Sequence, residues 1–112
     1  MLDWNGYRKE LGAAVGEIAA LSPDVLKGHD TLAAAATEGK ALDAKTRELI
    51  ALAVAVTTRC DGCIAVHAGA AQKVGATKEE VVEALGVAIA LNAGAALVYS
   101  ARTIEAFEAS KK

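Results

Sequence analysis

The chain has 112 residues, of which 54 % are hydrophobic, 4 % aromatic and 23 % charged, and its formal net charge is −2. This length favours a single domain, residues 1–112, over two. The near-neutral charge argues against a nucleic-acid-binding protein, and the hydrophobic content argues against a disordered chain. Alanine, the best helix former, supplies 27 positions beside one proline, so we predict an all-α fold.

The hydrophobic fraction exceeds the value of about 45–50 % that is usual for soluble chains. A domain of this size has a high ratio of surface to volume and cannot bury so many apolar side chains in its own core. We therefore expect a homo-oligomer, in which copies of the chain cover apolar surface on one another.

The sequence opens MLDWNGYRKEL, with charges of both signs and no apolar run, and so predicts no signal peptide. Residues 84–101 form an uncharged stretch of 18 residues, which reaches the length of a short transmembrane helix. The stretch is largely alanine and includes Gly86, Asn92 and Gly94, which favours two helical pieces buried in protein. We therefore expect a cytoplasmic protein without a membrane segment.

Apolar spacings of three and four residues, together with capping signals, predict a bundle of about six helices. Pro23 follows the expected cap Ser22. Thr77 and Glu80 form a capping box, and Asn92-Ala93-Gly94 is expected to break the helix that this box begins. The predicted helices cover approximately residues 3–20, 22–37, 43–58, 60–74, 77–91 and 95–109. Because almost nothing separates the third from the fourth, these two should pack as a central antiparallel hairpin.

Both cysteines of the chain lie in one motif, Cys60-Asp61-Gly62-Cys63, at the start of the fourth predicted helix. Residues three apart share a helix face, so the two sulfurs can form a disulfide or share a metal ion. In a cytosolic protein such a dithiol is more often catalytic or metal-binding than structural. The helix N-terminus favours a thiolate, and Arg59 adds a nearby positive charge.

His67 follows Cys63 by four residues and Cys60 by seven, so all three lie on one helix face. A neutral imidazole there can take a proton from a cysteine; a histidine satisfied by packing is the alternative. Glu48 lies in an apolar stretch of the preceding helix, where it is either a proton acceptor or a solvated residue near a helix N-terminus. Along the hairpin Glu48 and His67 are offset by roughly 6 Å, a distance that their two long side chains and a water molecule can span.

Other polar residues carry weaker signals. His29 stands among polar neighbours and is expected on the surface, while Tyr99 and Arg102 could line a pocket at a subunit contact. The chain has no glycine-rich nucleotide-binding motif, and Ile64 in place of histidine after the second cysteine argues against covalent haem. We expect no cofactor and no metal ion.

Three segments, residues 45–54 (KTRELIALAV), 60–67 (CDGCIAVH) and 76–81 (ATKEEV), resemble the core of the carboxymuconolactone decarboxylase family. Within that family the resemblance is to the alkylhydroperoxidase D-like branch. The motif core spans approximately residues 41–91, and the region around Tyr99 and Arg102 also fits. The resemblance implies an all-helical fold and a homo-oligomer, either a trimer or a hexamer.

The resemblance also implies a thiol-dependent peroxidase that reduces small organic hydroperoxides. In the family, a glutamate acting through a histidine deprotonates one cysteine, which attacks the hydroperoxide and becomes a sulfenic acid. The second cysteine resolves it as a disulfide, which a lipoyl-bearing or thioredoxin-like partner then reduces. Carried over, Glu48 and His67 form the proton relay; Cys63, one turn from His67, attacks, and Cys60 resolves. The helix-dipole argument alone would favour attack by Cys60.

This sequence departs from the pattern at Gly62, where fully active members of the branch carry a further histidine, so we expect less efficient turnover. Two other functions remain open. Cys60, Cys63, His67 and Glu48 are possible zinc ligands of a metal-binding oligomer, although three of them share one helix. The dithiol could also serve a redox sensor that is oxidised once and does not turn over.

Overall fold

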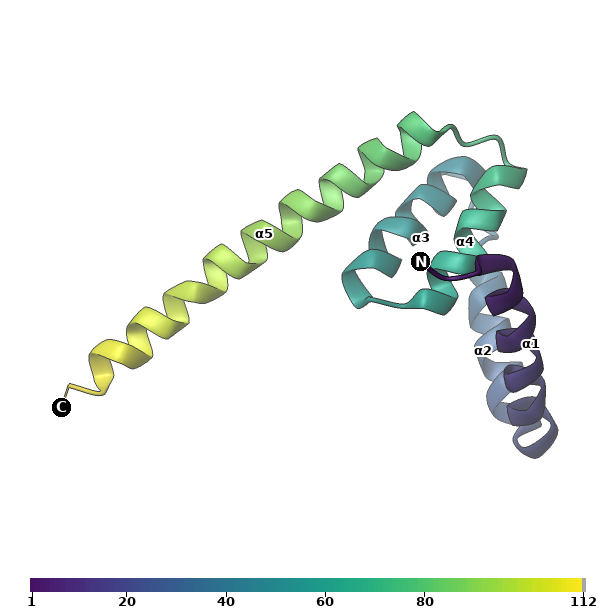
Figure 1. Cartoon of the computed structure of the whole chain (residues 1–112), viewed down its shortest axis with the longest axis horizontal. Coiled ribbons are helices and arrows are strands. Elements are labelled where there is room, and N and C mark those ends of the chain that lie inside the picture. Colours follow the sequence, from purple (N-terminus) through teal and green to yellow (C-terminus); the bar gives the residue numbers. More distant parts are fainter. Residues whose placement is uncertain (112) are drawn as a thin grey trace.

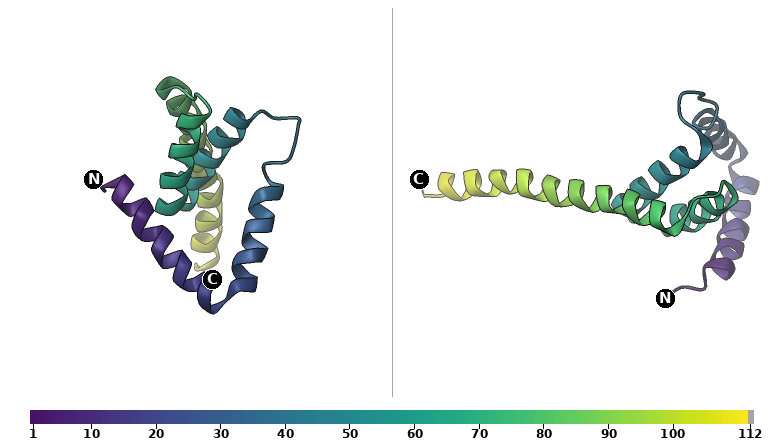
Figure 2. Two further views of the ribbon diagram at one scale, coloured as in Figure 1. Left: turned by 90° about the vertical axis from the view of Figure 1, so that its right-hand side faces the viewer. Right: turned by 90° about the horizontal axis from the view of Figure 1, so that it is seen from above.

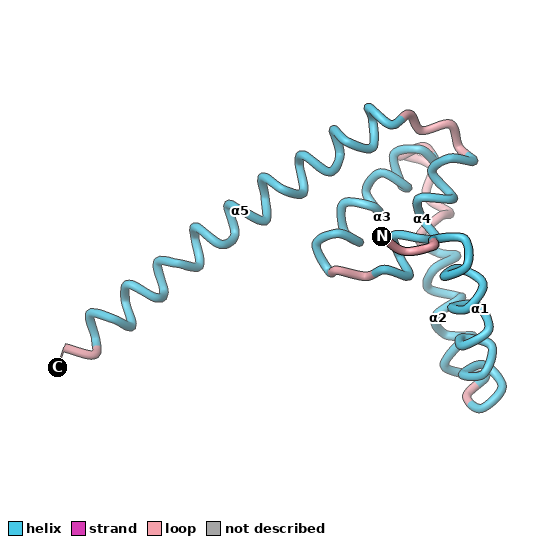
Figure 3. The backbone as a smooth tube through the Cα atoms, in the orientation of Figure 1, coloured by secondary structure: helices cyan, strands magenta, loops and turns pink. Residues whose placement is uncertain are grey.

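The structure, a computed structural model, describes residues 1–111 and places them in five α-helices, with no strand in that range (Figures 1 and 3). The helices are α1 (Trp4–Leu21), α2 (Pro23–Ala35), α3 (Ala44–Thr58), α4 (Asp61–Lys73) and α5 (Lys78–Ala109). The predicted all-α fold is confirmed, and the first four helices lie where they were expected. The fifth and sixth predicted helices are one continuous helix, so the predicted number of six is wrong.

Short polar side chains at the helix starts satisfy backbone N–H groups that would otherwise lack partners. Asp43 accepts a hydrogen bond from the backbone nitrogen of Thr46 at 2.8 Å and begins α3. Thr77 and Glu80 form the predicted capping box of α5. Pro23 begins α2 as predicted, but the side chain of Ser22 makes no capping hydrogen bond.

The expected break at Asn92-Ala93-Gly94 does not occur, because α5 continues through it. The side-chain amide of Asn92 donates to the carbonyl of Ala88 at 2.7 Å and to Oγ1 of Thr57 at 3.0 Å. Asn92 is therefore satisfied within a helix and does not compete for the backbone. Gly94 costs the helix about 1 kcal/mol relative to alanine, which the surrounding alanines and leucines, as good helix formers, can offset.

The helix α3 is the centre of the fold, since both α4 and α5 pack on it. It runs antiparallel to α4 as predicted and parallel to α5. Lys45 pairs with Glu80 at 2.8 Å at one end of the α3–α5 contact, and Thr57 meets Asn92 at the other. The buried hydrophobic side chains belong to these three helices and, apart from one leucine, are alanines: Leu52, Ala55, Ala65, Ala71 and Ala88. The hairpin that carries the cysteines is thus held at the core.

The N-terminal hairpin and the end of α5 both extend away from this core. α1 packs on α4, whereas α2 touches only α1 among the described helices, and the two diverge from their turn (Figure 2). Beyond Asn92, α5 projects alone from the body (Figures 1 and 2). The radius of gyration is 18.5 Å, whereas a compact chain of this length has one of about 13 Å.

The projecting helix is strongly apolar. Within residues 1–111, α5 is the one helix long and apolar enough to cross a membrane by length and composition, with a mean hydropathy of 2.0 over its most apolar window. Core helices of soluble proteins pass the same test but are mostly buried, whereas only 6 % of this window is buried within the chain, so the burial expected for this stretch is not provided by the chain itself. Its exposed apolar side chains on the projecting part are Leu97, Val98, Tyr99, Ile104 and Phe107.

Candidate redox site

The dithiol lies at the tight corner between α3 and α4. α3 ends at Thr58, and Arg59 adopts a left-handed backbone conformation with φ of 53°. This conformation is uncommon for residues other than glycine, asparagine and aspartate, and it turns the chain sharply. The backbone nitrogen of Cys60 then donates to the carbonyl of Ala55 at 3.0 Å, which closes α3. Cys60 is therefore fixed at the point where α4 begins.

Cys60 is the N-cap residue of α4. Its Sγ accepts a hydrogen bond from the backbone nitrogen of Cys63 at 3.1 Å, in the place where a serine or aspartate oxygen usually caps a helix. The Cys63 thiol also donates to this sulfur, and together with the backbone N–H groups of Cys63 and Gly62 it lowers the pKa of Cys60. Partial burial and the charge of Asp61 oppose this effect. Cys60 is thus the sulfur of the pair whose ionisation is favoured.

The pKa of Cys63 is shifted in the opposite direction. Its thiol is the donor to Cys60, and this hydrogen bond, together with burial and the charge on Cys60, raises the pKa of Cys63. Both cysteines are free thiols and are partly exposed. The pKa values of the two thiols are therefore shifted in opposite directions, so Cys60 loses its proton before Cys63 does and the two sulfurs are chemically distinct.

Glu48 of α3 and His67 of α4 are in direct contact. Oε2 of Glu48 lies 2.7 Å from Nδ1 of His67, so no water is needed between them, unlike the water-bridged geometry expected from the sequence. The side chain of Glu48 is 18 % exposed and that of His67 is 37 % exposed. When the carboxylate is ionised it can only accept, so a neutral imidazole then carries its hydrogen on Nδ1 and its lone pair on Nε2. The pair thus offers a proton acceptor one helical turn after Cys63.

The helix α1 covers the first turn of α4, which the sequence analysis did not anticipate. A Cβ atom on Gly62 would lie 2.9 Å from Cδ2 of Leu11 and 4.0 Å from the hydroxyl of Tyr7. The space that a side chain at position 62 would occupy is thus filled from α1. No local sequence pattern signals this contact, because it joins residues about fifty positions apart.

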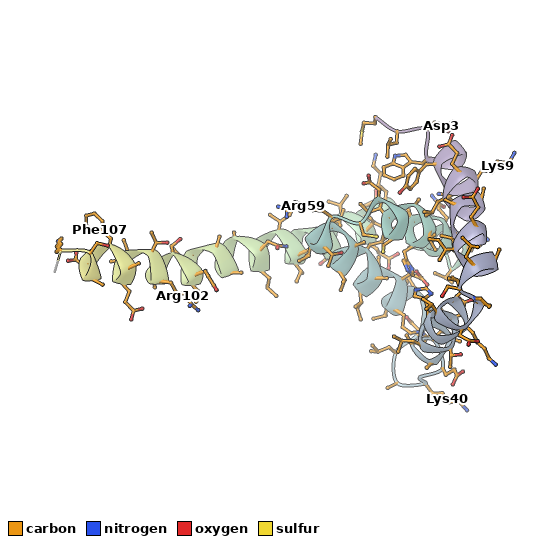
Figure 4. The ribbon with its side chains drawn as sticks, turned by 90° about the horizontal axis from the view of Figure 1, so that it is seen from below. Asp3, Lys9, Lys40, Arg59, Arg102 and Phe107 are labelled. Atoms are coloured by element: carbon orange, nitrogen blue, oxygen red, sulfur yellow. The ribbon has the colours of Figure 1, made fainter. Side chains whose placement is uncertain are left out.

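The other residues singled out in the sequence lie elsewhere. Arg102 is on the projecting part of α5 (Figure 4), as is Tyr99, and the guanidinium carbon of Arg102 lies 4.8 Å from the centre of the Tyr99 ring. His29 is exposed on α2 beside Asp30, as predicted. Within residues 1–111, no three His, Cys, Asp or Glu side chains converge in a way that could hold a metal ion.

Comparison with known proteins identifies the fold and the family. The carboxymuconolactone decarboxylase family profile matches residues 23–106. The chain belongs to this family. It is 39 % identical to a carboxymuconolactone decarboxylase family protein from Legionella pneumophila, whose apo crystal structure matches with a TM-score of 0.76 over 97 % of each chain.

Two further proteins are similar to this member of the carboxymuconolactone decarboxylase family. A crystal structure from Methanobacterium thermoautotrophicum matches with a TM-score of 0.67 and 30 % identity, over 73 % of this chain and 94 % of that one. An uncharacterized protein of Haemophilus influenzae is 53 % identical over 109 residues, 97 % of this chain and 96 % of that protein. The family contains decarboxylases and peroxidase-like enzymes, and the C-x-x-C pair is consistent with its alkylhydroperoxidase D-like branch.

Proposed function

We propose that this member of the family is a thiol-dependent peroxidase that reduces small organic hydroperoxides through Cys60 and Cys63. The hydrogen bonding from Cys63 to the sulfur of Cys60 is the observation that carries the proposal. It favours the thiolate form of Cys60 beside the Cys63 thiol in one helical turn. Peroxide reduction uses both, because the thiolate is the nucleophile and the thiol then resolves the sulfenic acid as a disulfide.

In the proposed reaction, Cys60 attacks the terminal oxygen of the hydroperoxide. An S–O bond forms, the O–O bond breaks, and the alkoxide leaves as an alcohol after taking a proton from water, so that Cys60 becomes a sulfenic acid. Cys63 then attacks that sulfur, forms the disulfide and releases the hydroxyl as water. The two thiols lose two electrons, which the hydroperoxide gains. This order reverses the roles that the spacing to His67 favoured, because hydrogen bonds from Cys63 lower the pKa of Cys60.

The contact between Glu48 and His67 supports a relay that serves Cys63. With Nδ1 held by Glu48, Nε2 of His67 can accept the proton of Cys63 as this thiol attacks the sulfenic acid. The carboxylate stabilises the imidazolium so formed, and the proton passes to the departing hydroxyl. Because Cys63 holds its proton tightly, its deprotonation is the step at which a base is most useful.

Sustained activity requires a partner that reduces the disulfide, and we propose a dithiol carrier, lipoyl-bearing or thioredoxin-like. Both sulfurs are partly exposed at the corner of the hairpin, which leaves the disulfide open to an attacking thiolate. A reducing compartment would keep the pair ready between turnovers, so we place the protein in the cytoplasm.

We also propose a homo-oligomer, a trimer or a hexamer. The described chain exposes 8668 Å², whereas a folded monomer of its mass exposes about 5,800 Å². The excess is of the size that a subunit buries in a large permanent assembly. The projecting part of α5 carries much of the exposed apolar surface, and the soluble fold of the family favours a protein partner over lipid as its cover.

The experiment that tests the peroxidase proposal is intact mass spectrometry with a free-thiol count, before and after one equivalent of tert-butyl hydroperoxide. We expect both thiols and two hydrogens to be lost within seconds, with release of one equivalent of alcohol. Oxidation as slow as that of free cysteine would contradict the proposal. Fast oxidation that cannot be repeated in the presence of dihydrolipoamide or reduced thioredoxin would instead indicate a redox sensor.

A further inference from the structure

A groove lies between α4 and the first turns of α5. Both helices pack on α3 and not on each other, so α3 forms the floor of the gap between them. The groove has a volume of about 630 Å³, within the range of small-molecule sites. Its apolar lining comes from Trp4, Leu52, Val56, Ile64, Val81 and Leu85. None of the four residues of the candidate redox site lines it, so the groove is a separate feature.

Two cations stand in this apolar lining. Arg8 reaches across from α1, and Lys78 stands at the start of α5. Nε of Arg8 donates to the carbonyl of Ala65 at 2.7 Å, and Nη1 donates to the side chain of Asn5 at 2.6 Å. These two bonds fix the guanidinium, and its Nη2 lies over Gly69, where a Cβ would be 3.5 Å away.

Neither cation is neutralised within the part of the chain that the structure describes. The ion pairs of residues 1–111 involve His29, Lys45, His67 and Lys111, but neither Arg8 nor Lys78. The two bonds made by Arg8 go to neutral oxygens, and Nη2 has no hydrogen-bond partner there. A half-buried guanidinium beside apolar side chains is better stabilised by an anion than by neutral acceptors alone.

We propose that this groove binds an amphipathic monocarboxylate. The carboxylate is held by Nη2 of Arg8 and by the ammonium group of Lys78, and the apolar chain lies along the wall formed by α4. That wall extends from Ile64 to Gln72, eight residue steps or about 12 Å of helix, which suits an aliphatic chain of medium length. The proposal does not depend on the peroxidase chemistry, because the groove and the dithiol share no residue.

Titration with decanoate, below the concentration at which it forms micelles, tests the proposal. Trp4 is the only tryptophan of the chain and lines the groove, so its fluorescence reports binding, and calorimetry gives an independent affinity. We expect saturable binding of decanoate, at least tenfold weaker binding of decanol, and none of decyltrimethylammonium. Equal affinity for decanol and decanoate would overturn the proposal. Tighter binding of decyl phosphate would overturn the choice of a carboxylate.

Matched variants locate the anion. Arg8→Gln should weaken decanoate binding at least tenfold, and Lys78→Gln should weaken it as well. Lys9→Gln removes a neighbouring cation that points away from the helical body and should leave the affinity unchanged (Figure 4). If Arg8→Gln loses helicity, the proposal is tested by the Lys78→Gln variant and by the ratio of the native protein's affinities for decanoate and decanol. No saturable signal from the native protein, or equal losses in Lys9→Gln and Lys78→Gln, would overturn the site.

Discussion

The backbone nitrogen of Cys63 donates a hydrogen bond to Sγ of Cys60 across 3.1 Å, so the first cysteine of the pair caps the helix that carries the second. The cap needs an acceptor, and a thiolate is a better acceptor than a thiol. Capping of α4 and hydrogen bonding within the dithiol therefore both stabilise the thiolate form of Cys60. The hydrogen bonds lower the pKa of Cys60 and raise that of Cys63.

This asymmetry predicts different reactivities for the two single-cysteine variants. In Cys63→Ser, Cys60 keeps the backbone N–H bonds and gains a hydroxyl donor, so its pKa should remain below the ordinary value of 9.0. In Cys60→Ser, Cys63 loses the neighbouring charge but keeps its burial, and its pKa should not fall below that value. When the rate of iodoacetamide alkylation is plotted against pH, the midpoint of the curve should therefore lie at a lower pH for Cys63→Ser than for Cys60→Ser. The same midpoint in both variants, or the reverse order, would refute the assignment.

The contact between Glu48 and His67 predicts a defect in the second step of the proposed reaction. Glu48→Gln retains the shape of the side chain but cannot stabilise an imidazolium, so disulfide formation should slow by about 100-fold. The first step should be little changed, and sulfenic acid should accumulate on Cys60, where dimedone can trap it. Glu83→Gln, at an exposed site on α5, is the control. A Glu48→Gln protein that forms the disulfide at the native rate would exclude the relay.

Local signals predicted much of this arrangement. Asp43 and the Thr77–Glu80 capping box set the starts of α3 and α5, because capping depends on residues within one turn. The approach of Glu48 to His67 followed from counting residues along a tight hairpin. The identity of the thiolate was harder to predict, because it depends on whether α4 begins just before or just after Cys60.

Contacts between distant segments could not be predicted from the sequence. Asn92 looked like a helix breaker, but its second hydrogen-bond partner, Thr57, lies on another helix. Leu11 and Tyr7 gave no sign that they would cover Gly62. In both cases the deciding partner is supplied by tertiary packing, which overrides the local preference.

Gly62 stands where the alkylhydroperoxidase D-like branch carries a further histidine, and the packing of α1 predicts that this histidine cannot simply be restored. Gly62→His would force Leu11 out of its position and should destabilise the fold by about 1–3 kcal/mol, measured by denaturant unfolding. Gly62→Ala needs less room and should cost less.

A double-mutant cycle tests the origin of this loss. Leu11→Ala removes the obstructing methyl groups, so Gly62→His should be less destabilising in that background, with a coupling of about 0.5 kcal/mol or more. Additive effects of the two substitutions would show that Leu11 is not the cause.

The ion pair between Lys45 and Glu80 predicts sensitivity to acid. Lys45 and the capping bonds lower the pKa of Glu80 below its ordinary value of 4.5, and the Thr46 hydrogen bonds likewise lower the pKa of Asp43. A carboxyl whose pKa is lower in the folded state stabilises the fold above its unfolded pKa, and this stabilisation is lost as the pH falls through the folded pKa. The free energy of unfolding should therefore decrease below about pH 5.

Glu80→Gln provides the matched test of this pH dependence, since it retains a side chain able to bond the backbone of Thr77. The variant should be less stable than the native protein at pH 7, and the difference should shrink toward pH 3. Glu79→Gln, which removes a neighbouring acid without an ion pair among the described residues, should leave the curve nearly unchanged. A constant difference between Glu80→Gln and the native protein at all pH values would contradict the prediction.

The projecting part of α5 predicts that assembly depends on its apolar side chains. Leu97 and Ile104 are seven residues apart, so they share one face of the helix, and both are exposed in the isolated chain. Replacing both by glutamate would place two charges in any interface that covers this face, and desolvating them is unfavourable. We expect the mass measured by light scattering to fall from that of a trimer or hexamer to that of the 11.4 kDa protomer. Glu105→Gln, on the same segment, should leave the assembly intact. An unchanged mass in the double variant would show that another surface, such as that of α2, holds the subunits together.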